Sequence, residues 1–255
     1  MRWAGVDLAT VREERAYLVR IVTRQALDRL RVLGRRKESY VGPWLPEPLL
    51  TAPDVAEDVE LAESVSTAML LVSETLAPIE RAVFVLREVF DLDYEEIAAA
   101  VGKSAAAVRQ IAHRARGHVA ARRPRGVTSP AETRAVIEAF QRAVETGDLQ
   151  ALLDILAPDV VALSDGGGVR HALLRPVVGA AVVARLLTSG WTRRGVDRSF
   201  ELIQVNGSPG LLVWLNGELD GVLTARVENG RVMGIYHVRN PERLSRAGHE
   251  TTMSR

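Results

Sequence analysis

The fold of the first half of this chain follows from residues 94–116, which read YEEIAAAVGKSAAAVRQIAHRAR. Ile97 and Val101 lie about one helical turn apart, and Gly102 follows, where a glycine adopts the positive φ of a tight turn at little cost. Ser104 then offers a side-chain oxygen that can cap a second helix. The apolar face of that helix is formed by Val108, Ile111, Ala112 and Ala115. The spacing predicts a helix-turn-helix.

The second of these helices carries a polar and basic face. Away from the apolar residues lie Arg109, Gln110, His113 and Arg114. Side chains of these types hydrogen-bond base edges and phosphates, so the pattern predicts a recognition helix for a DNA major groove. From Gly102 to Gly126 there are seven Lys and Arg residues and no Asp or Glu, although the whole chain has a net charge of only +1. This local excess favours DNA binding over the alternative, an ordinary helical hairpin with a solvated basic face.

Composition excludes several classes of function. The 255 residues, 47% hydrophobic and 25% charged, suit two modest globular domains. No apolar run is long enough for a membrane span, and charged residues follow Met1 too early for a signal peptide, so we expect a cytoplasmic protein without a membrane partner. The absence of Cys excludes disulfides and thiolate sites, and five scattered His residues predict neither a metal site nor a cofactor.

Two segments precede the helix-turn-helix. Residues 14–33 have the spacing of an amphipathic helix, and residues 24–37 contain six basic residues against a single acid, which favours a polyanionic partner. Residues 40–48, YVGPWLPEP, contain three prolines and a glycine, which prevent regular structure, and Trp44, which favours burial. We therefore expect an extended segment docked on another surface, with an ordinary buried loop as the alternative.

The remaining elements follow from periodicity and turn residues. Two more helices are expected between residues 61 and 90, the second with Phe90 on its apolar side, and they complete a four-helix unit. Residues 122–128 mark a linker, and Ser129 caps a new helix. The elements expected next are helices at 129–146 and 149–156, a strand at 160–163, a helix at 177–187, and strands at 200–205, 211–215, 222–227 and 232–238. Asn-Gly pairs between the last strands predict hairpins, hence an α+β domain whose curved sheet wraps a helix.

Together these features resemble an ECF-type bacterial sigma factor that carries a C-terminal SnoaL-like extension. Residues 76–116 look like its fourth-region DNA-binding domain. Residues 16–31, AYLVRIVTRQALDRLR, are similar to the end of its second region, whose helix reads the minus-ten promoter element. Three short motifs resemble those of the extended subgroup, namely Tyr40 to Pro48, Asp165-Gly166-Gly167-Gly168 and Asn240-Pro241-Glu242-Arg243-Leu244.

The resemblance implies a multidomain chain, with an all-α helix-turn-helix domain followed by an α+β SnoaL-like cone-shaped barrel domain. The implied divisions are a remnant of the second region at 1–36, a linker with the Trp/Pro motif at 37–60, the fourth region at 61–122, a linker at 123–128, the SnoaL-like domain at 129–245 and a tail at 246–255.

The resemblance also implies promoter recognition on behalf of RNA polymerase core, with the extension as a built-in regulator in place of a separate anti-sigma factor. In the helix that Ser104 begins, the implied readers of the minus-thirty-five element are Arg109, Gln110, His113 and Arg114, with Lys103 and Arg116 on phosphates. On the upstream helix the implied contacts are Arg20, Arg24 and Asp28.

Our hypothesis for the extension is that its glycine motif docks on the linker, because even a weak tethered contact has a high effective concentration. The residues expected in this contact are Trp44, Pro46, Glu47, Asp165, Gly166, Gly167, Gly168 and Arg170.

The chain departs from the family pattern at two places. The earlier helices of the second region, which grip the polymerase clamp, would lie before Arg2-Trp3, so the resemblance implies a shortened second region. After the glycines the family usually has Lys, whereas this chain has Val169 and then Arg170. A basic contact to the linker would therefore come from Arg170.

Three other interpretations stay open on the sequence. Residues 166–168 could form only a flexible loop. A one-component regulator could bind a small effector in a pocket of the extension and so alter its affinity for DNA. SnoaL-like folds also include isomerases and hydrolases, and the titratable candidates for such chemistry are Asp159, Asp165, His171, Tyr236 and His237. None of these forms a recognisable pair by spacing, so catalysis is not expected.

Overall fold

The computed structural model describes residues 14–38, 40–51, 70, 76–122, 129–191, 196–244 and 250–251. The chain divides into two compact units, Met1–Ser39 with Val72–Arg122 and Tyr40–Leu71 with Arg123–Arg255. This division groups residues 40–51 with the second half of the chain. Most of the helix expected at 61–76, the linker at 123–128 and most of the tail lie outside the described residues. The domain borders implied by the resemblance stay a prediction.

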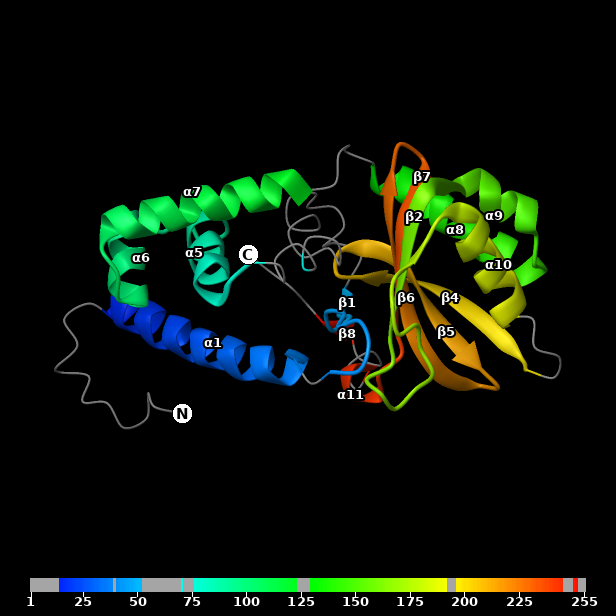
Figure 1. Ribbon diagram of the computed structural model, residues 1–255, viewed down its shortest axis with the longest axis horizontal. Coiled ribbons are helices and arrows are strands. Elements are labelled where there is room, and N and C mark those ends of the chain that lie inside the picture. Colours follow the sequence, from blue (N-terminus) through cyan, green and yellow to red (C-terminus); the bar gives the residue numbers. More distant parts are fainter. Residues whose placement is uncertain are drawn as a thin grey trace. The chain divides into compact units, whose positions relative to one another are not determined.

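The first unit contains the helices α1 (Glu14–Glu38), α5 (Pro78–Glu88), α6 (Tyr94–Val101) and α7 (Ala105–Arg122) (Figure 1). Asp93 caps α6, because its carboxylate accepts a hydrogen bond from the Glu96 N–H at 2.7 Å. Gly102 ends α6 with a φ of +69°. The core of the unit is formed by Val83, Leu92, Ile97, Ala98, Val108, Ile111 and Ala112. The expected helix-turn-helix is confirmed.

Two helices of this unit differ in extent from the expectation. The first, α1, continues to Glu38, beyond the expected end at residue 33. The second, α5, ends at Glu88, and Asp91 adopts a φ of +48°, so the chain turns away from the helix axis. Phe90 is consequently 63% exposed, and Leu92 enters the core in its place.

The second unit is an α+β domain built on one mixed sheet. In spatial order its described strands are β3 (Val177–Val178), β2 (Leu156–Asp165), β7 (Arg231–Val238), β6 (Glu218–Glu228), β5 (Ser208–Leu215), β4 (Arg198–Val205), β1 (Leu50–Thr51) and β8 (Glu250–Thr251). The pairs β2–β7 and β1–β8 are parallel, and the other neighbours are antiparallel. The helices of this unit are α8 (Pro130–Thr146), α9 (Leu149–Ile155), α10 (Ala180–Trp191) and the short α11 (Pro241–Leu244) (Figure 1).

The hairpins of this sheet form at Asn-Gly pairs, as expected. Asn206, Asn216 and Asn229 have φ of 50°, 51° and 50°, a conformation that Asn adopts at lower cost than most residues. The expected fold class, a helix-turn-helix domain followed by an α+β domain, is confirmed. The strand expected at 160–163 is longer, because β2 already pairs with β7 at Leu156 and shifts register before Val161. The expected helix at 177–187 begins at Ala180, because the residues before it pair with β2.

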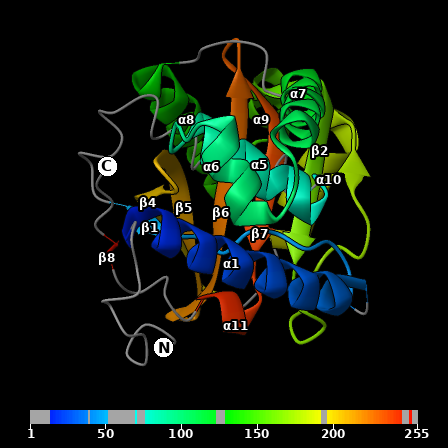
Figure 2. The same cartoon turned by 90° about the vertical axis from the view of Figure 1, so that its left-hand side faces the viewer.

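The two faces of the sheet carry separate hydrophobic cores. Along β5, Leu211 and Val213 face the core that includes α8, α9 and α10, whereas Leu212 faces the other side. On that other side Leu45 packs with Tyr236 and Val238 of β7, and Leu50 packs beside Val205 and Val222. Residues 40–51 therefore line the sheet face opposite α8, α9 and α10 (Figures 1 and 2).

Candidate nucleic-acid interface and linker-binding site

The surface of α7 opposite its core is a stripe of exposed residues, namely Ala106, Gln110, His113 and Gly117. Within the described residues, Gln110 and His113 make no side-chain hydrogen bond or ion pair. The small residues at the two ends let the helix approach another surface closely. At the start of α7, the Ser104 hydroxyl accepts a hydrogen bond from the Ala107 N–H at 3.2 Å and caps the helix.

Three arginines of α7 lie on the flanks of this stripe and contact carboxylates. Arg109 Nη2 lies 2.9 Å from an oxygen of Glu95 in α6. Two other cations contact α5, with Arg114 Nε 3.6 Å from Glu80 and Arg116 Nη1 3.4 Å from Glu88. Lys103 is exposed in the turn before the helix. Of the residues predicted to read bases, the side chains least engaged within the described protein are therefore Gln110 and His113.

The predicted contacts on α1 share its exposed surface. Arg20, Arg24 and Asp28 are all exposed, whereas Thr23 and Leu27 are buried. The guanidinium of Arg20 lies 5.3 Å from the centre of the Tyr17 ring, and Asp28 pairs with Arg31 at 2.8 Å.

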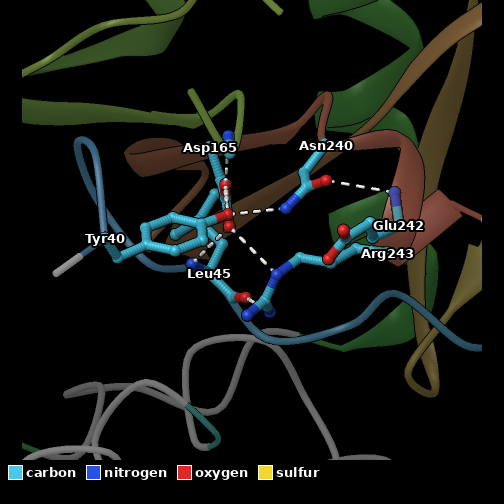
Figure 3. A network of polar contacts seen from close by, with 7 residues as sticks. Tyr40, Leu45, Asp165, Asn240, Glu242 and Arg243 are labelled. Carbon is cyan, nitrogen blue, oxygen red and sulfur yellow. Dashed lines mark hydrogen bonds and ion pairs between the residues drawn. The ribbon is translucent and has the colours of Figure 1, made fainter. Parts of the chain in front are cut away.

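Asp165 stands at the centre of a second site, in the second unit. It ends β2, and its carboxylate is fully buried. It accepts hydrogen bonds from the Tyr40 hydroxyl, from the Leu45 N–H at 3.0 Å and from the Gly167 N–H at 3.1 Å (Figure 3). Arg243 Nε lies 3.4 Å from the same carboxylate and compensates its charge. A buried carboxylate of the extension thus binds the segment 40–51 directly.

Asn240 and Arg243 complete this linker-binding site from the end of β7 and from α11. The Asn240 amide donates a hydrogen bond to the Tyr40 oxygen at 2.7 Å. Arg243 donates to the Leu45 carbonyl, and its guanidinium lies 3.6 Å from the centre of the Trp44 ring. Burial, followed by the hydrogen bond to Asp165, raises the pKa of Tyr40 to about 12. Tyr40 therefore stays a protonated donor at neutral pH.

Gly166, Gly167 and Gly168 allow the turn after β2 to pack closely against neighbouring groups. A Cβ on Gly166 would overlap the Arg170 carbonyl, and one on Gly167, whose φ is +64°, would overlap the Asn240 side chain. A Cβ on Gly168 would lie 3.4 Å from the Val41 side chain. Only glycine fits the first two positions without displacing the neighbouring groups.

The segment 40–51 has a second attachment at the β4–β5 hairpin. The Asn206 N–H donates to the Leu49 carbonyl at 2.8 Å, and the Leu49 N–H donates to the Asn206 side chain at 3.1 Å. The Gly207 N–H donates to the Thr51 hydroxyl at 3.0 Å. Leu50 pairs with Val205, so the segment ends as a strand of the sheet.

The site differs from the expectation at Arg170. Its Nη1 lies 3.8 Å from Asp220, which Arg239 also holds through two contacts of 2.6 and 2.9 Å. The cation at the linker is Arg243 instead, because α11 folds back beside Asp165. Pro46 and Glu47 are half-buried in the same extended segment. The expected set omitted the important side chains of Tyr40, Asn240 and Arg243, although all three lie in motifs visible in the sequence.

The residues considered for acid–base chemistry are dispersed. Asp159 and His171 are exposed, and Asp165 is occupied by the linker. Tyr236 and His237 are neighbours in β7 and point to opposite faces of the sheet. Burial, then the nearby Arg239, lowers the pKa of His237 to about 3. The described residues contain no group of three or more His, Cys, Asp or Glu that could hold a metal ion.

Comparison with known proteins identifies the family. The model of sigma-70 region 4 matches residues 66–119, which include α5, α6 and all but the last three residues of α7. The ECF RNA polymerase sigma factor SigJ of Mycobacterium tuberculosis is 32% identical, with coverage of 96% of this chain and 82% of SigJ. The probable ECF sigma factor SigI of the same species is 33% identical, with coverage of 95% and 82%. The chain belongs to the ECF sigma factor family.

The structure agrees with this membership. The crystal structure of the M. tuberculosis ECF sigma factor SigJ aligns with a TM-score of 0.71 and 29% identity, with coverage of 95% of this chain and 86% of SigJ. The resemblance inferred from the motifs is confirmed. As an ECF sigma factor, the chain acts in transcription initiation, and the matched relatives are named as sigma factors rather than as enzymes. In the described part of this sigma factor, no helix is long and apolar enough to cross a membrane.

Proposed function

We propose that this ECF sigma factor reads promoter DNA with α7 and that its α+β extension restrains this reading by holding residues 40–51. The observation that carries the regulatory part is the hydrogen bond from the half-buried Tyr40 to the buried carboxylate of Asp165. Residues 40–51 follow α1 directly and belong to the stretch of chain that joins α1 to α5. Holding them on the extension leaves less free chain between α1 and α5.

The DNA-reading part rests on the stripe of Gln110 and His113. Both side chains are exposed and have donors and acceptors for base edges. The flanking cations supply attraction to phosphates, which releases counterions and makes the affinity fall as salt rises. Because Arg114 and Arg116 already contact carboxylates of α5, their attraction to phosphate is partly compensated within the protein.

Docking of the linker is specific rather than a general hydrophobic contact. Asp165 is fully buried, and the donors around it come from residues 40 and 45 as well as from the extension itself. Removing one donor leaves a buried carboxylate under-satisfied, which costs about 1–3 kcal/mol. Loss of one hydrogen bond therefore weakens the whole attachment of residues 40–51 to the extension, as expected of a regulatory contact.

The test is promoter-directed transcription with RNA polymerase core, alongside DNA binding by the full chain. We expect Gln110→Ala and His113→Ala to lower transcription from the selected promoter, and Tyr40→Phe to raise it. Arg185→Ala, an exposed change in α10, serves as the control. Unchanged transcription by the α7 variants would overturn the reading role, and unchanged transcription by Tyr40→Phe would overturn the restraint.

A further inference from the structure

Tyr94, in the first turn of α6, contacts cationic side chains of α5 and α7. The Tyr94 ring is half-buried against the core of the first unit, so its position is fixed. The guanidiniums of Arg87 and Arg109 lie 5.2 and 5.7 Å from the centre of this ring. A hydrogen bond to Tyr94 raises the pKa of Arg116. One aromatic ring therefore organises cations from both α5 and α7.

The residue after Tyr94 in α6, Glu95, also contacts Arg109. Arg109 Nη2 lies 2.9 Å from Glu95 Oε1, while its guanidinium faces Tyr94, so two adjacent residues of α6 fix its direction. The side chains of Arg109 and Glu95 are 54% and 66% exposed, which leaves the pair accessible to a ligand. A guanidinium has five N–H donors, and among the described residues Arg109 uses one of them in its hydrogen bond to Glu95.

The carboxylate has two opposite consequences for DNA binding. It orients the guanidinium, which favours the planar, bidentate contact by which Arg reads guanine. It also adds a negative charge beside the recognition helix, which weakens attraction to any phosphate backbone. From this geometry we propose that Glu95 is a positioning residue that makes Arg109 discriminate between bases at the expense of non-specific affinity. This inference rests on the proposed DNA-reading function of α7.

The competing explanation is that Glu95 only stabilises α6. An acidic residue in the first turn of a helix is favourable for any sequence, and exposed ion pairs contribute little to stability. A purely structural role predicts that replacing Glu95 weakens all DNA binding alike through partial unfolding. The positioning role predicts opposite changes in non-specific and specific binding.

The experiment uses the full chain and a library of random DNA duplexes from which wild type selects its preferred sequence. Affinities for the preferred and a scrambled duplex are then measured across salt concentrations for wild type, Glu95→Gln, Arg109→Ala and the double variant. Glu138→Gln is the matched control, because Glu138 forms a similar exposed pair with Arg134 in the extension. Thermal unfolding of each variant reports any loss of structure.

We expect Glu95→Gln to bind the scrambled duplex more tightly, with a salt slope steeper by about one unit. We expect its ratio of preferred to scrambled affinity to fall about fivefold, as estimated from the discrimination of one bidentate contact. In the Arg109→Ala background, Glu95→Gln should leave the ratio of preferred to scrambled affinity unaltered. The positioning role of Glu95 is wrong if Glu95→Gln leaves the ratio of preferred to scrambled affinity undiminished. It is also wrong if Glu95→Gln lowers this ratio equally in the Arg109→Ala background. Either result leaves the proposed DNA-reading function of α7 intact. Failure of wild type to select any sequence overturns the proposed function as well.

Discussion

The hydroxyl of Tyr40 donates a hydrogen bond to the buried carboxylate of Asp165, 125 residues further along the chain. Asn240 in turn donates to the oxygen of Tyr40, so three distant segments meet at one phenol. The linker that follows α1 is thereby attached to the extension through polar groups whose partners are all inside the second unit. Disruption of any partner leaves another buried group unsatisfied.

Tyr40→Phe should loosen the linker without unfolding the sheet. The change removes one donor from Asp165 and one acceptor from Asn240, and we expect docking to weaken by about 1–3 kcal/mol. Hydrogen exchange at the Leu45 amide, which donates to Asp165, should become faster. Tyr17→Phe in α1 is the matched control. Unchanged exchange at Leu45 would show that the phenol contributes nothing to docking.

Arg243→Met should weaken docking more strongly than Tyr40→Phe. Its guanidinium is the cation nearest Asp165 in the described site, and a buried charge that loses its partner costs about 3–5 kcal/mol. The double variant Arg243→Met/Asp165→Asn should be less destabilised than the sum of the two single variants, because the amide carries no charge. Chemical unfolding of all four proteins measures this coupling. Additive losses would contradict the charge compensation.

Gly167→Ala should disturb the linker site beyond the cost of its backbone conformation. Both Gly167 and Gly217 have positive φ, of +64° and +79°, but only at Gly167 would a Cβ meet another group, the Asn240 side chain. Gly217→Ala therefore measures backbone strain alone, about 1–2 kcal/mol. We expect Gly167→Ala to lose at least about 1 kcal/mol more and to expose Trp44 fluorescence to quenching. Equal losses in both variants would exclude the steric contribution.

The extension should lose stability as the pH falls below neutrality. Burial and then Arg239 lower the pKa of His237 to about 3, although Asp220 opposes the shift and Arg198 adds to it. The unfolded chain binds a proton near pH 6.5, whereas the folded chain does so only near pH 3, so the contribution is present above pH 6.5 and disappears between these values.

At pH 5 we expect the free energy of unfolding to be lower by about 2 kcal/mol than at pH 7 from this group alone. Chemical unfolding of wild type and His237→Gln at both pH values gives the comparison. The variant should show a smaller difference, because Gln does not titrate. The same difference in both proteins would assign the pH dependence to other groups.

Local sequence signals predicted the elements whose geometry is fixed within a few residues. Gly102 marks the end of α6, and Ser104 caps α7, because positive φ and capping act within one helical turn. The Asn-Gly pairs at 206, 216 and 229 located the hairpins for the same reason. Apolar spacing then placed the core of α7, and the run of basic residues without an acid between Gly102 and Gly126 indicated a DNA partner, although the structure pairs three of these arginines with carboxylates of α5 and α6. The sequence by itself therefore determined the helix-turn-helix, the antiparallel hairpins and, through its motifs, the family.

The linker site was decided by tertiary structure. Asp165 reaches the end of β7 because β2 and β7 pair in parallel, with Asp165 opposite Val238, and a parallel pair has no short turn that would reveal its register. That register brings Asn240 and Arg243 to Asp165, while the turn after β2 sends Arg170 towards Asp220. Long-range hydrogen bonds depend on where whole strands align, so motifs identified the segments involved, and only the folded sheet determined which side chains meet.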